Sequence, residues 1–130
     1  MRLGGVMKMK KRKKRRGKLP SVTTMDRHHI CFQKRYWNKG YAKAICTAFV
    51  RYVPVVYHRE LHTILHTVPV PDPVLLKEAW NKYQKERETI DAYDVTRAAA
   101  WLYVNIPDEK FRRAMQLQID FFTTKSSRSG

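Results

Sequence analysis

The spacing of apolar residues in the second half of the chain restricts the fold more than any other feature of the sequence. Apolar side chains there recur every three or four residues, which is the repeat of an amphipathic α-helix. Three helices are predicted, over about 73–88, over about 95–104, and from Pro107 onward. Asp72 and Asp94 are predicted N-caps, because a short side-chain oxygen accepts from the free amides of a first turn. The aromatic and methionine side chains of these helices are expected to form the core.

The first half of the chain alternates between extended and helical patterns. Short β-prone runs indicate strands, helical spacing indicates a buried helix face, and proline disfavours helix at the residue before it. The predicted segments are a strand at 27–33, a basic aromatic loop at 34–40, a helix at 41–51, an extended stretch at 53–57, a helix at about 58–67 and a rigid proline-rich connector at 68–73.

Positive charge is concentrated at the start of the chain. The formal net charge is +16, from 27 Lys and Arg against 11 Asp and Glu. Residues 1–20 hold ten of the 27 and no acidic residue, which leaves 17 basic against 11 acidic, a net of +6, for residues 21–130. The first segment is predicted to be a disordered tail that binds phosphates, because its like charges repel and it has no apolar face. Its candidate phosphate contacts are Lys11, Arg12, Lys13, Lys14, Arg15 and Arg16.

Cysteine usage and hydropathy exclude several classes of protein. Cys31 and Cys46 form no CxxC pair, so a zinc ribbon is not supported, and buried free thiols of a reducing cytosol are expected. No apolar run approaches the length of a membrane span, and the basic N-terminus is not followed by the apolar stretch of a secretory signal. We therefore expect a cytoplasmic protein with no membrane partner, and the oligomeric state is left open.

All five histidines fall in two short segments. His28 and His29 are adjacent, whereas His58, His62 and His66 follow one another at intervals of four on a predicted helix. Residues four apart share a helix face, so His58 and His62 can hold one ion. His66 lies about 12 Å along the helix axis from His58, so it is expected to contact phosphate instead. Imidazole suits zinc, nickel and similar cations, and a neutral neighbouring histidine can act as a general base on water.

These residues carry a resemblance to a known family. The segments DRHHI at 26–30 and HRELH at 58–62 resemble the HNH, or His-Me finger, endonucleases. The likeness is to the subclass ending in His-x-x-x-His, found in colicin-type DNases, and it covers about residues 26–66. The family folds as a ββα-metal unit, so the resemblance implies two strands and a helix around a divalent ion.

The resemblance also implies roles for four of the histidines. Carried over position by position, His29 is the general base, and His28, His58 and His62 are the metal ligands. The expected cofactor is a divalent ion, either zinc, nickel or magnesium. It would stabilise the extra charge on the attacked phosphate and on the leaving oxygen.

The chain departs from the family pattern in its spacer. The family usually has a central asparagine about nine residues before the first helical histidine, and here that place falls on or near Phe49. The only asparagine between the two histidine clusters is Asn38. The spacer is also predicted to contain a helix, so a variant finger is expected.

The expected fold is α+β and mostly helical. A basic tail at 1–20 precedes a ββα-like finger with an inserted helix at 21–70. C-terminal helices at 71–124 pack on the finger, so that 21–124 forms a single compact domain. The last five residues, 126–130, are expected to be loose.

The combined patterns predict a nucleic-acid-binding protein, with DNA favoured over RNA as the partner. A metal-dependent endonuclease of the kind carried by phages and mobile elements is the first interpretation. An inactive HNH-like DNA-binding module and a ribosome- or RNA-associated basic protein are the alternatives. Trp37 is expected to pack beneath its loop or to stack on a base, and Glu60 to face solvent or to orient a histidine. Near the site, the candidate phosphate contacts are Arg27, Lys34, Arg35, Lys39, Lys43 and Arg59.

Overall fold

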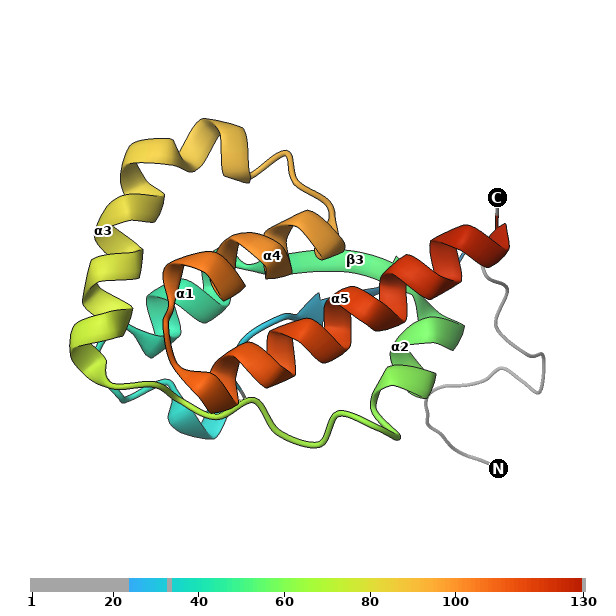
Figure 1. Cartoon of the computed structure of the whole chain (residues 1–130), viewed down its shortest axis with the longest axis horizontal. Helices are drawn as coiled ribbons and strands as arrows, with labels where there is room; N and C mark the ends of the chain where they lie inside the picture. Colours follow the sequence, from blue (N-terminus) through green and yellow to red (C-terminus); the bar gives the residue numbers. More distant parts are fainter. Residues whose placement is uncertain (1–23, 33, 130) are drawn as a thin grey trace, which may run out of the picture.

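In this computed structural model, which describes residues 24–32 and 34–129, helices surround a small antiparallel sheet (Figure 1). The sheet has two strands within the described residues, and the remaining elements are helical. The protein is therefore α+β and mostly helical, as the sequence predicts. The predicted basic tail and its six candidate phosphate contacts lie outside the described residues. Within the described part, no helix combines the length and the apolar character that crossing a membrane requires.

The sheet pairs strand β2, Met25–His29, with strand β3, Val50–Pro54. His29 lies opposite Val50, and one further bond, from the amide of Ile30 to the carbonyl of Phe49, extends the pairing. The predicted strand at 27–33 extends too far, because β2 ends at His29. The next three residues, Ile30, Cys31 and Phe32, are all buried in the core. Consecutive residues of a strand point to opposite faces of the sheet. A strand that packs on the core with only one face therefore cannot bury three residues in a row, so the strand does not continue through these three residues.

The segment between the strands contains a 3₁₀ turn, η1 (Lys34–Tyr36), and a short helix, α1 (Ala42–Ala48). Helix α2, Val55–Leu61, follows β3 directly with Pro54 as its N-cap residue. The expected extended stretch at 53–57 is therefore wrong after Pro54, because proline restricts the residue before it and not the residue after it.

The predicted helix over about 58–67 ends early, at Leu61. The hydroxyl of Thr63 donates to the carbonyl of Glu60 over 2.7 Å, and the amide of Thr63 bonds to the same carbonyl. These bonds turn the chain out of the helix, since a threonine hydroxyl competes for backbone groups. His66 consequently lies beyond the helix that carries His58.

Three helices complete the fold: α3 (Pro73–Ile90), α4 (Val95–Asn105) and α5 (Glu109–Ser129). Both predicted caps are confirmed, since the carboxylate of Asp72 accepts from the amide of Val74 and that of Asp94 from the amide of Arg97. The start of the third helix differs from the prediction, because the Asp108 carboxylate accepts from Phe111 and caps α5 after Pro107. The expectation of a loose end at 126–130 is wrong for 126–129, which continue α5.

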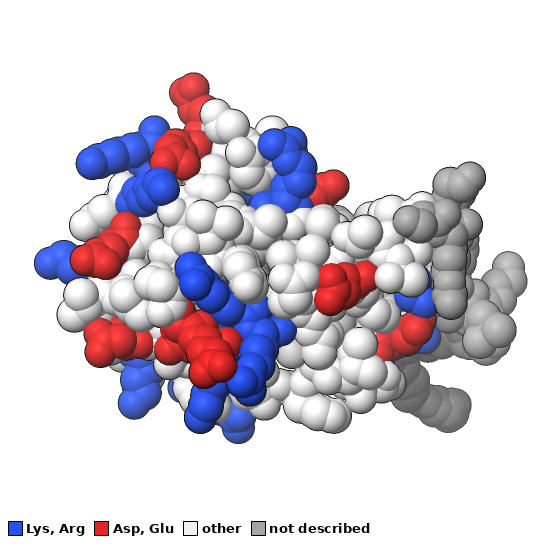
Figure 2. All heavy atoms as spheres, in the orientation of Figure 1, with Lys and Arg blue, Asp and Glu red and all other residues white. Residues whose placement is uncertain are grey.

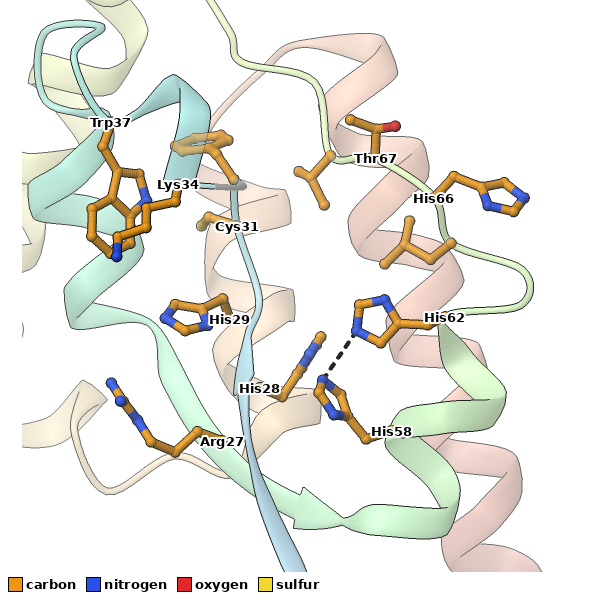
Figure 3. A pocket seen from close by; sticks show the side chains of 13 residues that line it. Arg27, His28, His29, Cys31, Lys34, Trp37, His58, His62, His66 and Thr67 are labelled. Carbon is orange, nitrogen blue, oxygen red and sulfur yellow. Dashed lines mark hydrogen bonds between the residues drawn. The ribbon is translucent and has the colours of Figure 1, made fainter. Parts of the chain in front are cut away.

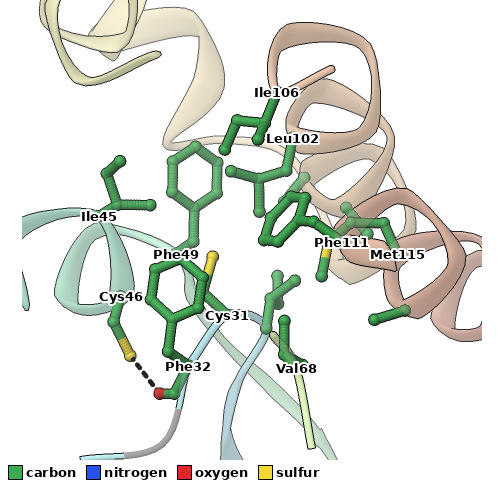
Figure 4. Packing of buried hydrophobic residues seen from close by; sticks show 14 of the residues in the cluster. Cys31, Phe32, Ile45, Cys46, Phe49, Val68, Leu102, Ile106, Phe111 and Met115 are labelled. Carbon is green, nitrogen blue, oxygen red and sulfur yellow. Dashed lines mark hydrogen bonds between the residues drawn. The ribbon is translucent and has the colours of Figure 1, made fainter. Parts of the chain in front are cut away.

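The core lies between the sheet and the C-terminal helices (Figure 4). The ring of Phe49 stacks on Trp101 at a centroid distance of 5.5 Å, and Phe32 meets Phe111 at 5.8 Å. Both cysteines are buried free thiols, as expected, and the Cys46 thiol donates to the carbonyl of Phe32 over 3.0 Å. These contacts hold α4 against the residue that precedes β3 and α5 against the chain that leaves β2, and α5 crosses the sheet (Figure 1).

Charged side chains are mixed on the face of the molecule shown in Figure 2. Lysine and arginine lie beside aspartate and glutamate there, and wide areas between them carry no charge. This face has no continuous basic surface among its described atoms.

Candidate metal centre

Three of the predicted site residues come together in space. One ring nitrogen from each of His28, His58 and His62 lies within 4.8 Å of the other two, and no other group of three or more possible ligands occurs in the described part of the chain. His28 comes from β2, His58 from α2, and His62 from the turn that ends α2. Because α2 starts directly after β3, its side chains reach the neighbouring strand (Figure 3). The predicted grouping of these three histidines is confirmed.

The buried side chain of Gln118 determines which ring nitrogen of His28 carries the proton. The amide nitrogen of Gln118 donates to the carbonyl of Ile30 over 3.0 Å and lies 3.4 Å from the carbonyl of Ala114. Its oxygen is therefore the atom that faces Nε2 of His28, at 2.7 Å, so Nε2 carries the proton and donates. Nδ1 is left as the nitrogen with a lone pair.

That lone pair is buried without a partner. The His28 side chain is 2% exposed, and Nδ1 finds no hydrogen-bond donor among the described residues. An unsatisfied buried polar atom costs about 1–3 kcal/mol. A cation at this atom would remove the cost, so the orphaned nitrogen fits a metal ligand.

The carboxylate of Asp26 likewise determines which ring nitrogen of His58 carries the proton. Nδ1 of His58 lies 2.9 Å from Oδ2 of Asp26, and a carboxylate only accepts, so Nδ1 is the protonated nitrogen. Metal-binding histidines usually donate their second nitrogen to such a group. Nε2 of His58 is left with a lone pair and accepts a hydrogen bond from Nε2 of His62 over 3.1 Å (Figure 3). Two nitrogens on a tetrahedral zinc ion lie about 3.3 Å apart, so this pair is already spaced as two ligands.

The charge states of His28 and His62 also suit a cation. Burial lowers the pKa of His28 from 6.5 to about 4, although its hydrogen bond to Gln118 raises it. Burial, followed by the nearby His58, lowers the pKa of His62. Neutral imidazole is the form that binds metals, and His28 is neutral near pH 7.

The three histidines line an open pocket of about 430 Å³. His29, Arg27, Lys34 and Trp37 line the same pocket, and no Asp or Glu is among its described lining residues. His29 is exposed. The part of its ring that is buried lowers its pKa, and the nearby Arg27 lowers it further. The rings of His28 and His29 lie on opposite sides of β2 (Figure 3), as alternate strand residues must.

His66 also lines the pocket but lies outside the three-histidine group, and its exposed ring points away from the other histidines (Figure 3). The expectation that it shares no ion with His58 fits this placement. The expected place for it on the same helix face is wrong, because α2 has already ended.

The six candidate phosphate contacts near the histidines lie in three places. Arg27 and Lys34 line the histidine pocket, whereas Lys43 lines a separate groove beside Trp37. Three others lie outside the pocket: they are Arg35, which packs on the Tyr36 ring, and the exposed Lys39 and Arg59. Glu60 is exposed on α2, as the solvent-facing interpretation predicts, and its carboxylate also pairs over 2.8 Å with the largely buried Lys125.

The backbone of Ile30, the residue after His29, is held by hydrogen bonds through both its amide and its carbonyl. The carbonyl of Phe49 accepts from the amide of Ile30, and the amide of Gln118 donates to the carbonyl of Ile30. Phe49 itself is fully buried, and Asn38 is exposed. Gln118 therefore ties the backbone beside His29 to the ring of His28.

Two members of this site were not named from the sequence as site residues. Asp26 lies two residues before His28 on a strand, and such residues share a face, so this signal was present. Gln118 is 90 residues from His28, and no sequence pattern connects the two.

Replacing Gln118 with methionine is expected to weaken zinc binding about 10- to 100-fold, the usual effect of losing a group that orients a ligand. Methionine keeps the length of the side chain but removes both the acceptor for His28 and the donor to Ile30. Gln116→Met is the matched control, since Gln116 is exposed on the same helix. Calorimetric zinc titration measures both variants. Unchanged affinity in a folded Gln118→Met protein would show that Gln118 does not act on the site.

Acid is expected to destabilise the metal-free protein through His28. The pKa of His28 is lower in the folded state than in the unfolded chain, so between pH 6.5 and about 4 the unfolded chain binds more protons. Stability is therefore full above pH 6.5 and falls as the pH drops, by about 3 kcal/mol for this shift. Urea unfolding in EDTA at pH 7 and pH 4.5 measures the loss. His28→Gln should show a shallower decline, and an equal decline in both proteins would exclude His28 as the cause.

Comparisons of the chain with protein-family models, with curated proteins and with solved structures find no match.

Proposed function

We propose that this protein is a metal-dependent endonuclease that hydrolyses DNA phosphodiester bonds. The observation that carries the proposal is the convergence of three histidine nitrogens at an open pocket that also presents Arg27, Lys34 and an exposed fourth histidine. A buried structural ion would not need an open pocket, cationic walls or a further base. Phosphodiester hydrolysis uses all of them.

The ligand set supports a particular class of ion. Three imidazoles suit zinc or nickel, whereas magnesium prefers oxygen ligands. Three protein ligands also leave a coordination position for an oxygen atom, as catalytic zinc sites do. A divalent ion bound here would supply Lewis-acid stabilisation of the negative charge on the attacked phosphate and the leaving oxygen.

The remaining pocket residues have separable tasks in this proposal. Arg27 and Lys34 attract and hold the phosphate through charge, and Arg27 can bond to two phosphate oxygens at once. His29 removes the proton from the attacking water. Its pKa is lowered by burial and then by Arg27, so it is neutral near pH 7 and able to accept a proton.

A DNA-binding module that does not cut is the second candidate. The observation that favours it is Phe49, a fully buried aromatic residue at the place where the HNH resemblance leads us to expect asparagine. Gln118 argues for the first candidate, because it braces the same stretch of backbone from another helix. The two candidates share the metal and the pocket, and they differ only in turnover.

Cleavage of supercoiled plasmid tests the proposed function. The protein is stripped with EDTA and reloaded with zinc, nickel or magnesium, and metal content is measured in parallel. Nicked and linear DNA are expected with zinc or nickel, and EDTA should prevent both. The endonuclease proposal fails if a preparation with one bound ion per chain cuts neither single- nor double-stranded DNA. Cleavage of RNA alone would overturn the choice of DNA.

A further inference from the structure

We propose that a groove between α1 and α3 binds an unpaired base of the nucleic-acid strand together with its adjoining phosphate. The groove has a volume of about 610 Å³ and lies outside the histidine pocket. Its walls include Trp37, Lys43, Trp80, Tyr83 and Arg87. This inference rests on the proposed function in one respect, namely that the bound strand is the one whose phosphate enters the histidine pocket.

Trp80 provides a rigid stacking surface in the groove. Its ring lies 5.4 Å from that of Tyr83 at an interplanar angle of 26°, so one face of the indole is supported by a second aromatic ring. Tyr83 is held in turn, because its hydroxyl donates to Asp91 over 2.6 Å. Trp80 is half-buried, whereas Tyr83 is only 3% exposed. An indole that is fixed on one side and partly open is suited to stack on a planar ligand.

The charge of the groove selects an anion. Lys43 is exposed on α1, and its Nζ lies 6.0 Å from the centre of the Trp37 ring. Arg87 adds a second cation at the α3 side, although a 3.6 Å contact with Asp91 offsets part of its charge. No Asp or Glu is among the described residues that line the groove. Aromatic rings beside cations are the combination that binds single-stranded nucleic acid, since bases stack and phosphates pair with the cations.

Trp37 connects the groove to the candidate metal centre. It lines both the groove and the histidine pocket. Nζ of Lys34, a pocket residue, lies 5.9 Å from the centre of the Trp37 ring, and Nζ of Lys43, a groove residue, lies 6.0 Å from it. A strand with one phosphate at Arg27 and Lys34 can therefore pass over Trp37 and place a neighbouring nucleotide beside Trp80. The bound segment must be unpaired, because a base inside a duplex does not offer its ring face.

The test must separate base stacking from general attraction to phosphate, because the basic segment at 1–20 is predicted to bind any strand. We would measure fluorescence anisotropy of a labelled oligothymidylate and of a strand of equal length made of abasic sites, both in EDTA. The wild type is expected to favour the base-bearing strand about five- to 150-fold, the equivalent of one stacked base. Trp80→Leu should remove most of this preference, and Trp80→Phe should retain part of it.

Two lysine variants complete the experiment. Lys43→Gln should weaken binding of both strands and reduce the salt slope by about 0.7, the loss of one phosphate contact on a single strand. Lys77→Gln is the matched control, since Lys77 is exposed on α3 but does not line the groove. Circular dichroism and zinc stoichiometry verify that each variant is folded.

Equal affinity of the wild type for the two strands would overturn the proposal. So would a folded Trp80→Leu protein that keeps the full preference. Since EDTA prevents metal-dependent cleavage, these outcomes do not depend on turnover. Failure of plasmid cleavage would overturn the endonuclease proposal and leave the groove result standing.

Discussion

Replacing either His58 or His62 with alanine is expected to abolish stoichiometric binding of zinc or nickel while α2 stays folded. Each histidine supplies one of three converging nitrogens. A structural zinc site of four ligands is worth about 10–16 kcal/mol, or about 3 kcal/mol per ligand, so losing one should cost at least about 10²-fold in affinity. Calorimetry of metal-stripped protein measures the stoichiometry, and far-UV circular dichroism measures the helix.

His66→Ala is the matched control for these variants. His66 is exposed, lines the same pocket and lies four residues beyond His62, yet it falls outside the ligand group. The His66→Ala variant should bind one ion with the same affinity as the wild type. If His66→Ala lost the ion while His58→Ala kept it, the ligand assignment would be wrong.

Replacing His29 with alanine is expected to reduce plasmid cleavage by about 10²- to 10⁴-fold, the usual contribution of a general base. Metal binding should remain, because His29 lies on the opposite side of β2 from His28 (Figure 3). His28→Ala should behave differently, since it removes a ligand and leaves the hydrogen-bond acceptor of Gln118 without its partner. Metal affinity should therefore fall in this variant.

Plasmid cleavage and zinc titration of the two variants, side by side, measure this difference between neighbouring residues. A His29→Ala protein that loses zinc would contradict the assignment of His29 as a base outside the ligand set. Equal cleavage by His29→Ala and the wild type at saturating metal would show that another group activates the water.

The sequence predicted those features that depend on nearby residues. The caps at Asp72 and Asp94 and the helices that follow them are confirmed, because capping and helical spacing act within a few residues. The pairing of His58 with His62 follows from helix geometry in the same way. The errors lie where two local signals compete, as at Pro54 and Thr63, which set the two ends of α2.

Features that depend on contacts between distant elements were not predictable. Gln118 reaches His28 because α5 crosses the sheet, and the hydrophobic pattern of α5 gives no reason to single out one buried polar residue. The groove beside Trp80 arises only when α1 and α3 pack together. The three-histidine group was found from the sequence because a family resemblance supplied the long-range pairing of two segments that spacing alone could not.

The most direct test of the metal centre is anomalous diffraction from crystals of the zinc-loaded protein, recorded at the zinc absorption edge. We expect one strong peak, about 2.0–2.1 Å from Nδ1 of His28, Nε2 of His58 and Nε2 of His62. The bond between His28 and Gln118 and the bond between His58 and Asp26 should both be intact beside it. A peak on exposed histidines such as His29 or His66, with none at the three-histidine group, would contradict the assignment of His28, His58 and His62 as ligands.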